Sequence, residues 1–442
     1  MTGVLAADGS KDAACPIPVA LARGGNRSSA AGWPPRSAYL HIPFCHRRCF
    51  YCDFPVVPLG DRASGAAGDP GSASIAAYLQ LLLGEIALAP SGPPLSTVYV
   101  GGGTPSMLTA VQLAELLNAL RRRFGFAPAA EVSLELDPAS FDQRRLAGYL
   151  AAGVNRVSLG GQSFDDAVLE RLGRRHRRAD LVEAAGWLHT ARAQGRLVSW
   201  SLDLIQGLPG LDRSAWERQL QQAIDLDPPH LSVYDLIVEP GTVFERLEAR
   251  GELALPEPDL SADLMELTAQ RLAAAGYGHY EISNFARPGH AARHNRVYWS
   301  GAGWWGFGLG ATAAPWGLRE ARPRTREGYA AWLAARQAGA AARENARREL
   351  GMPLDERVMV GLRRREGVAL EPLLAAAGLG GEALEALRRS WQPFLERGLL
   401  LREGPRWRLS DPEGLALSNA VLRELLAWWE ALTGAEDRPP SP

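Results

Sequence analysis

Two hydrophobic patterns alternate along residues 38–275. Short apolar runs that predict buried strands are each followed by longer stretches with apolar residues at helical spacing. The predicted strands lie at 38–43, 96–103, 131–136, 155–161, 197–205 and 230–236. The predicted helices lie at 75–88, 113–124, 141–151, 165–173, 179–194, 213–226 and 259–275.

This alternation predicts an α/β fold with a parallel sheet and helical crossovers. Each predicted strand runs into Gly, Pro, Asp or Glu at its carboxyl end, where barrel folds carry their chemistry. Six strand–helix units rather than eight favour a partial (β/α)6 TIM-like barrel that is open on one side. A doubly wound open sheet is the alternative.

The remaining chain differs in character. Residues 276–350 begin with a segment dense in aromatic residues, glycine and histidine, without a clear period, and we expect it to close the barrel. Beyond it, helical patterns followed by a short hairpin predict a winged-helix-like module. Both ends are rich in small residues and proline, which predicts disorder. The predicted divisions are 1–36, 37–275, 276–350, 351–433 and 434–442.

Composition excludes several classes of function. The net charge of −1 gives no overall attraction to nucleic acid or anionic membrane. The winged-helix-like end could bind nucleic acid, but its one basic run, at 363–366, is short and diluted by acidic neighbours. No apolar run is long enough for a transmembrane helix, and the first residues do not form a signal peptide. We therefore expect a cytoplasmic protein with no nucleic-acid partner and at most peripheral contact with membrane proteins.

Three of the four cysteines lie close together in the sequence. Cys45, Cys49 and Cys52 have the spacing C-x3-C-x2-C, whereas Cys15 lies far upstream and is expected to be a free thiol. Three thiolates in one loop can bind a soft metal centre. Structural zinc requires four ligands, and His41 or His46 could supply the fourth, so zinc remains an alternative. A [4Fe–4S] cluster with one open iron fits three thiolates better.

The cysteine spacing, with Tyr51 before the last cysteine, resembles the signature of the radical SAM superfamily. The resemblance implies a cluster whose open iron is chelated by S-adenosylmethionine (SAM). It also implies that an electron from the reduced cluster can cleave SAM to give a 5′-deoxyadenosyl radical. The glycine-rich turn GGGTP at 101–105 resembles the segment that holds the methionine amino group in that superfamily.

Polar residues at the ends of the predicted strands complete this pattern. Binding SAM would need carboxylates for the ribose hydroxyls and an arginine for the methionine carboxylate. Taken singly, such a carboxylate is often only solvated or paired, and a glycine-rich turn is often only a tight turn. The resemblance implies that SAM is bound by Tyr39, Tyr51, Gly102, Gly103, Thr104, Glu135, Gln162, Arg174 and Asp203.

Further motifs between residues 38 and 312 resemble the oxygen-independent coproporphyrinogen III oxidase-like family. They include GGGTP, SVYDLIVEPGT and HNRVYW. The oxidases carry another cysteine just after the cluster motif, but here Asp53 and Phe54 follow Cys52, as in the heme chaperones called HemW. The resemblance therefore implies a protein that binds heme or porphyrin, passes heme to an acceptor protein and uses a reductant such as a flavodoxin or ferredoxin. Oxidation of coproporphyrinogen III is the alternative function.

His294 in HNRVYW is the candidate heme ligand, because neutral imidazole is a common axial ligand of heme iron. The alternative is that it only packs or forms hydrogen bonds. One departure from the family pattern follows at 310–312, which reads Gly-Ala-Thr where relatives commonly carry a His-Ser pair. His279, His290 and His41 are weaker ligand candidates, and the aromatic residues that could cover a porphyrin face are Tyr298, Trp299, Trp304, Trp305 and Phe307.

Overall fold

A computed structural model describes residues 34–339 and 352–434. The predictions made for Cys15, for most of the amino-terminal extension, for the end of the connector and for nearly all of the carboxyl-terminal tail lie outside the described residues. Within the described ranges, no helix is both long and apolar enough to cross a membrane.

The core of the fold is a nine-stranded sheet whose six central strands are parallel and follow one another in chain order. Successive right-handed crossovers in one direction place all the connecting helices on one face of a sheet, which then curls into a barrel. A doubly wound sheet would instead reverse its strand order. The partial-barrel prediction is thus confirmed. The six strands are β1 (Ser37–Ile42), β4 (Leu95–Gly102), β5 (Phe126–Leu136), β6 (Arg156–Gln162), β7 (Ser199–Gln206) and β8 (His230–Asp235).

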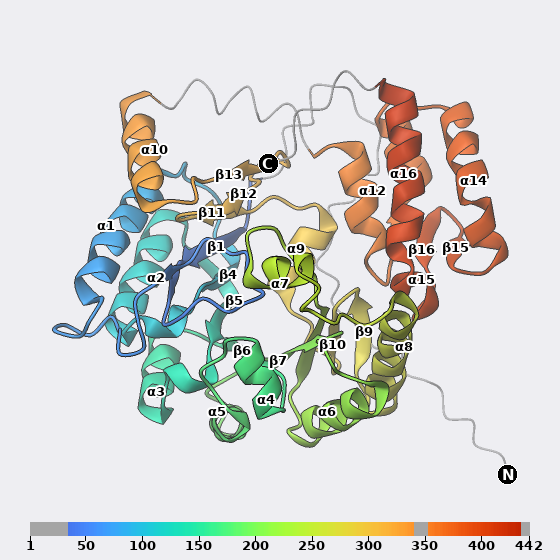
Figure 1. Ribbon diagram of the computed structural model, residues 1–442. Coiled ribbons are helices and arrows are strands. Elements are labelled where there is room, and N and C mark those ends of the chain that lie inside the picture. Colours follow the sequence, from blue (N-terminus) through green and yellow to red (C-terminus); the bar gives the residue numbers. More distant parts are fainter. Residues whose placement is uncertain (1–33, 340–351, 435–442) are drawn as a thin grey trace, which may run out of the picture.

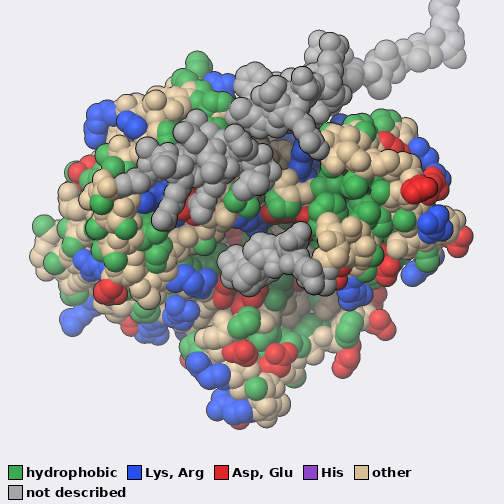
Figure 2. All heavy atoms as spheres, turned by 90° about the horizontal axis from the view of Figure 1, so that it is seen from above, with side chains coloured by type: hydrophobic (Ala, Val, Ile, Leu, Met, Phe, Trp, Pro, Cys, Tyr) green, Lys and Arg blue, Asp and Glu red, His purple; other side chains and the backbone are tan. Residues whose placement is uncertain are grey.

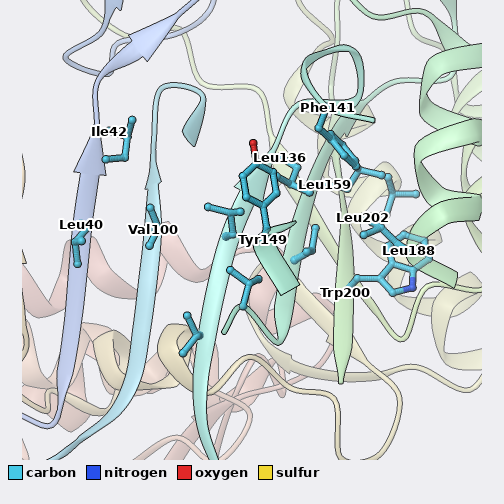
Figure 3. Close-up of a cluster of buried hydrophobic side chains, with 14 of the residues drawn as sticks. Leu40, Ile42, Val100, Leu136, Phe141, Tyr149, Leu159, Leu188, Trp200 and Leu202 are labelled. Carbon is cyan, nitrogen blue, oxygen red and sulfur yellow. The ribbon is translucent and has the colours of Figure 1, made fainter. Parts of the chain in front are cut away.

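The connecting helices cover the outside of this sheet, as Figure 1 shows. All the helices predicted between residues 75 and 275 are present, and the short α7 (Val243–Ala249) was not predicted. Outward-facing strand residues such as Val100, Leu159 and Leu202 form the hydrophobic core with these helices (Figure 3). The helices are α1 (Ser72–Leu88), α2 (Ala110–Phe124), α3 (Gln143–Ala152), α4 (Asp166–Arg171), α5 (Arg178–Ala193), α6 (Arg213–Asp225) and α8 (Pro258–Ala274).

The alternate residues on these strands face the inside of the barrel, and most are polar. On β7, for example, Trp200 and Leu202 belong to the hydrophobic core, whereas Ser201 and Asp203 bond to each other inside the barrel. Barrel interiors are usually filled with branched apolar side chains. The polar interior therefore indicates that the inside of this barrel serves a site.

The segment 276–312, which has no clear sequence period, supplies strands to both edges of the sheet. The strands β9 (Gly278–Glu281) and β10 (Asn284–Ala286) add antiparallel beyond β8, and β11 (Trp305–Phe307) pairs in parallel with β1. Between them lies α9 (Arg293–Ser300). Among the described strands β9 and β11 remain separate edges, so this segment extends the sheet without closing the barrel.

A buried carboxylate fastens the β11 edge to the outer helices. Glu85 of α1 accepts hydrogen bonds from the Gly308 backbone N–H (2.7 Å), Arg322 Nε (2.9 Å) and the Tyr329 hydroxyl (2.6 Å). Tyr329 lies on α10 (Arg326–Gly339). The remaining short strands of this part are β2 (Phe44–Cys45), β3 (Val57–Pro58), β12 (Thr312–Ala313) and β13 (Glu320–Ala321).

Residues from 354 onward build a second, separate hydrophobic core that includes Trp391 and Trp407. The predicted divisions after residues 275, 350 and 433 remain our proposed domain boundaries. The hairpin and the helices around it give the winged-helix-like arrangement that was predicted. Its elements are α12 (Leu354–Leu362), β14 (Val368–Ala369), α13 (Leu370–Ala376), α14 (Gly381–Glu396), β15 (Leu400–Glu403), β16 (Arg406–Leu409), α15 (Glu413–Ala416) and α16 (Ser418–Thr433).

The basic run at 363–366 lies where this module meets the barrel. The Ile282 N–H donates to the Arg363 carbonyl (3.1 Å), and the Arg365 N–H donates to the Tyr280 carbonyl (3.2 Å). Nearby, His279 Nδ1 lies 2.7 Å from Asp411. On the face shown in Figure 2, basic and acidic side chains are interspersed. The backbone of the arginine run thus helps to join the two parts of the chain.

Candidate cofactor site

A cavity of about 480 Å³ opens at the carboxyl ends of the parallel strands. This volume lies within the range of roughly 300–1,000 Å³ that small-molecule sites occupy. All three clustered cysteines line it, together with eight of the nine residues predicted to bind SAM. Its wall also includes residues that the sequence analysis did not single out, namely Tyr99, Asp137, Tyr234, Asp235, Leu236 and Ile237.

The cysteine loop begins at β2 and is held by backbone hydrogen bonds on both sides. The Cys52 N–H donates to the Cys49 carbonyl (3.2 Å), and the Phe50 N–H donates to the Leu172 carbonyl (3.0 Å). All three thiols are free, and burial raises the pKa of Cys45 to about 12 and that of Cys52 to about 11. A metal centre must therefore displace their protons when it binds.

Donors surround these sulfur atoms. The Thr104 hydroxyl lies 3.6 Å from Cys45 Sγ, and Arg174 Nη1 lies 3.7 Å from Cys49 Sγ. Arg174 Nε is buried without a partner among the described residues, although buried polar atoms rarely lack one. The Arg174 guanidinium thus brings a positive charge and a spare N–H donor to the cysteine loop. This arrangement fits a cluster of negatively charged thiolates that carries a ligand with a carboxylate.

The glycine-rich turn packs directly against the cysteine loop. Gly102 has φ of 117°, in the left-handed region that favours glycine. A Cβ on Gly103 would lie 2.6 Å from the Phe44 carbonyl oxygen and 2.9 Å from Cys45 Sγ. Glycine at these positions thus lets the backbone approach the cysteines closely.

Two strand-end carboxylates face the cavity. Glu135 accepts a hydrogen bond from the Gly102 N–H (2.9 Å), and burial raises its pKa to about 7. Asp203 accepts from the hydroxyls of Ser158 (2.5 Å) and Ser201 (3.1 Å), and burial raises its pKa as well. Each carboxylate retains acceptor capacity toward the cavity, which suits the hydroxyls of a ribose.

The raised pKa of Glu135 predicts a pH-dependent stability of the cluster-free protein. The folded state binds this proton more tightly than the unfolded chain, so the stabilisation is complete below pH 4.5 and is lost as pH rises through about 7. Between pH 5 and 8, we expect the loss of the Glu135 contribution to lower the free energy of unfolding by about 2 kcal/mol. Denaturant titrations across this range measure it.

Glu135→Gln should flatten that pH profile, because the amide does not titrate. The exposed Glu115 on α2 offers a matched control, and Glu115→Gln should keep the wild-type profile. An unchanged slope in Glu135→Gln would contradict the burial argument.

Arg174 is held by a partner that the sequence analysis missed. Its Nη2 lies 2.6 Å from Asp137 and 2.9 Å from the Gly160 carbonyl oxygen. Burial favours the neutral form of Asp137, but Arg174 and His176 outweigh it and hold the pKa well below the ordinary range. Asp137 follows Glu135 by two residues in the motif ELDP, so both carboxylates reach the same side of the strand end.

Gln162 is strained where β6 ends. Its φ is 63°, in the left-handed region, and the pairing register with β7 shifts at the same point. Such a conformation in a residue other than glycine costs on the order of 1–3 kcal/mol and concentrates at ligand sites. The strain turns the Gln162 side chain onto the cavity wall.

Tyr51 lines the cavity, but Tyr39 does not. The Tyr39 hydroxyl instead lies 2.9 Å from His41 Nδ1, whose other ring nitrogen lies 3.1 Å from the Pro55 carbonyl oxygen. Tyr39 is thus engaged with His41 outside the cavity wall, and its part in SAM binding stays a prediction. His41 is also engaged away from the thiols, whereas His46 lies on the cavity wall.

His294 lies in α9, next to Thr97 of β4, and does not line the cavity. Only 1% of its surface is exposed. Its Nδ1 lies 2.8 Å from the Thr97 hydroxyl and its Nε2 lies 2.9 Å from the Tyr298 hydroxyl, so both ring nitrogens are engaged. Heme ligation by His294 would therefore require breaking a buried hydrogen bond, and its role as a heme ligand stays a prediction.

The other heme-site candidates are engaged as well. His279 contacts Asp411, and His290 lies 3.0 Å from the Ser199 hydroxyl. Trp305 and Phe307 are buried against Phe124, so their rings fill the core instead of covering a porphyrin.

We expect His294→Ala to lower the free energy of unfolding by about 3 kcal/mol, since it removes two buried hydrogen bonds and leaves a cavity. Heme stoichiometry should stay unchanged. Denaturant titration and heme titration test the two statements, with the exposed His189 as the control, replaced by alanine. Loss of heme binding at near-wild-type stability would restore His294 as the ligand.

Comparisons with known proteins identify the family of this chain. A family profile described as the radical SAM superfamily matches residues 39–222. The heme chaperone HemW of Synechocystis sp. is 41% identical over 407 residues, covering 89% of this chain and 97% of that protein. The heme chaperone HemW of Mycobacterium tuberculosis is 39% identical over 399 residues, covering 89% of this chain and 95% of that protein.

Among solved structures, coproporphyrinogen III oxidase (HemN) from Escherichia coli superposes with a TM-score of 0.71 at 23% identity, covering 91% of this chain and 93% of that one. At that identity the likeness shows a shared fold. The radical SAM family implies SAM and a [4Fe–4S] cluster as cofactors, and the thiols, the glycine turn and the spare Arg174 donor fit both. The chain belongs to the HemW family of the radical SAM superfamily.

Proposed function

We propose that this protein is a heme chaperone that binds heme and transfers it to an acceptor protein. The observation that carries the proposal is its similarity to proteins named HemW over 97% of the length of one of them. Asp53 and Phe54 after Cys52, in place of a further cysteine, favour the chaperone over the oxidase. A shared fold with HemN at 23% identity does not favour the oxidase.

Within this proposal, the chain's own groups have distinct tasks. Cys45, Cys49 and Cys52 would hold the cluster, and the chemistry that it would supply when bound is one-electron reduction. Arg174 offers its spare Nε donor to the methionine carboxylate of SAM. Glu135 and Asp203 accept hydrogen bonds from the ribose. A reductant of the flavodoxin or ferredoxin type would reduce the cluster, and the acceptor is a heme protein.

Heme needs a large apolar surface, and the mouth of the cavity provides one. Phe54 is 48% exposed and Ile237 is 64% exposed, and both line the cavity with Val56 and Leu236. Clustered exposed apolar side chains around a cavity mark ligand sites. We therefore propose that heme lies against this mouth and not at the buried α9.

Ile237→Asp should weaken heme binding by about tenfold, because it places a charge in the apolar contact. Val198, which is 66% exposed, gives the matched control, and Val198→Asp should bind heme like the wild type. Heme titration followed by absorbance measures both affinities. Equal affinities of the three proteins would exclude the cavity mouth as the heme site.

The function itself is tested with anaerobically reconstituted protein. We expect one heme per chain and transfer of that heme to a heme-free acceptor, measured by recovery of the acceptor's activity. Incubation with SAM, reductant and coproporphyrinogen III should leave the propionates intact. Formation of vinyl groups in that assay would support the oxidase in place of the chaperone.

A further inference from the structure

A second, much smaller chamber lies inside the barrel, next to Asp203 of the cofactor cavity. Its volume is about 20 Å³. It lies among inward-facing residues of neighbouring strands. These residues are paired in the sheet, Ser133 with Arg156 and Ser201 with His230. Polar side chains in its wall include those of Ser133, Arg156, Ser158, Ser201 and His230.

Three polar atoms of this wall are buried without a partner among the described residues. They are Ser133 Oγ, Arg156 Nη2 and His230 Nδ1. Their residues are only 1%, 6% and 1% exposed. Leaving a buried polar atom without a hydrogen bond is unfavourable, so three such atoms at one place would be unusual in a native fold.

We propose that this chamber is a binding site for one permanently bound water molecule, held by Ser133 Oγ, Arg156 Nη2 and His230 Nδ1. A water needs a cavity of at least about 10–15 Å³ and typically makes about three hydrogen bonds, and the chamber provides both. The water would satisfy all three unpartnered atoms at once.

The surrounding charges favour water over an anion. The Arg156 guanidinium lies 3.8 Å from the Glu131 carboxylate, and its Nη1 donates to the His290 carbonyl (3.0 Å). His230 is neutral, because burial holds its pKa well below the ordinary value. Asp203 adds a further carboxyl group beside the chamber, bonded to two of its serines. No excess positive charge therefore remains for a halide.

The water would support the cofactor site from within the barrel. Ser158 and Ser201 line the chamber, and their Oγ atoms lie 3.0 Å apart. Both hydroxyls donate to the Asp203 carboxylate. Filling the space beneath them keeps these hydroxyls aimed at the carboxylate. Ser133 is then a positioning residue that acts on Asp203 through the water and the two serines.

The test is a crystal structure of the cluster-loaded, SAM-bound protein at a resolution that shows ordered water. We expect one density peak within hydrogen-bonding distance of the three atoms. The peak should remain in Ser133→Ala, which keeps the space, and vanish in Ser133→Val, whose methyl groups fill it. An empty wild-type chamber, with other buried waters visible, would overturn the proposal. So would an anomalous signal in the chamber after a bromide soak.

SAM affinity gives a second measurement, which is separate from the iron content of the protein. We expect Ser133→Val to weaken SAM binding by about tenfold at unchanged iron content, and Ser133→Ala to stay within about twofold. Equal SAM affinity of both variants and the wild type would remove the positioning role of the water. These results do not depend on whether the protein carries heme.

Discussion

Replacing Cys49 by alanine is expected to abolish the iron–sulfur cluster. Anaerobically reconstituted wild type should carry about four iron and four sulfide per chain, whereas the variant should retain almost none, because two thiolates do not hold such a cluster. Cys45→Ala and Cys52→Ala should behave in the same way. Colorimetric iron and sulfide analysis and the visible absorbance of the cluster measure the effect.

The fourth cysteine provides the control for this experiment. Cys15 lies outside the C-x3-C-x2-C motif, so Cys15→Ala should reconstitute like the wild type. A cluster retained in any of the three motif variants, or lost in Cys15→Ala, would contradict the assignment of the ligands.

Arg174→Met is expected to be the most destabilising change of a charged residue in the cofactor site. It leaves Asp137, 2.6 Å from the guanidinium in the wild type, as an uncompensated buried charge. Removing one partner of a buried ion pair costs about 3–5 kcal/mol. Denaturant titration of the cluster-free protein measures the loss. In the cluster-loaded protein, SAM binding should weaken as well.

The neighbouring arginine is a matched control. Arg175 has a more exposed side chain, and its contact with Asp61 is longer, at 3.6 Å. Arg175→Met should therefore change stability by less than about 1 kcal/mol. The pair Arg174→Met with Asp137→Asn should recover part of the loss, since both charges are then absent. Equal effects of the two single arginine variants would refute the buried ion pair.

The parallel part of the fold could be predicted because local pattern and tertiary structure agree there. Each apolar run became a strand, and each amphipathic stretch became a helix on the outer face. The strand-end residues Glu135, Gln162 and Asp203 also met at one cavity, because the carboxyl ends of parallel strands converge. Their positions near the ends of predicted strands explain this convergence, whereas their assignment to SAM came from the family resemblance and stays a prediction.

Other features depend on contacts that a local pattern does not contain. The strands β9, β10 and β11 are short and are defined by their pairing, β10 with β8, β9 with β10 and β11 with β1. The segment around them therefore has no period of its own. His294 lies in the same segment, and its motif did not reveal that α9 turns it onto Thr97. The pairing of Asp137 with Arg174 likewise arises only when β5 and the loop after α4 come together.

Every role given to the cavity depends on three thiolates that hold an iron–sulfur cluster with one iron left open for SAM. Electron paramagnetic resonance of the reduced, reconstituted protein, recorded with and without SAM, tests it most directly. We expect a [4Fe–4S] signal that shifts when SAM is added and that is missing in Cys49→Ala. A protein that takes up stoichiometric zinc in place of iron, or a cluster signal that SAM leaves unchanged, would contradict it.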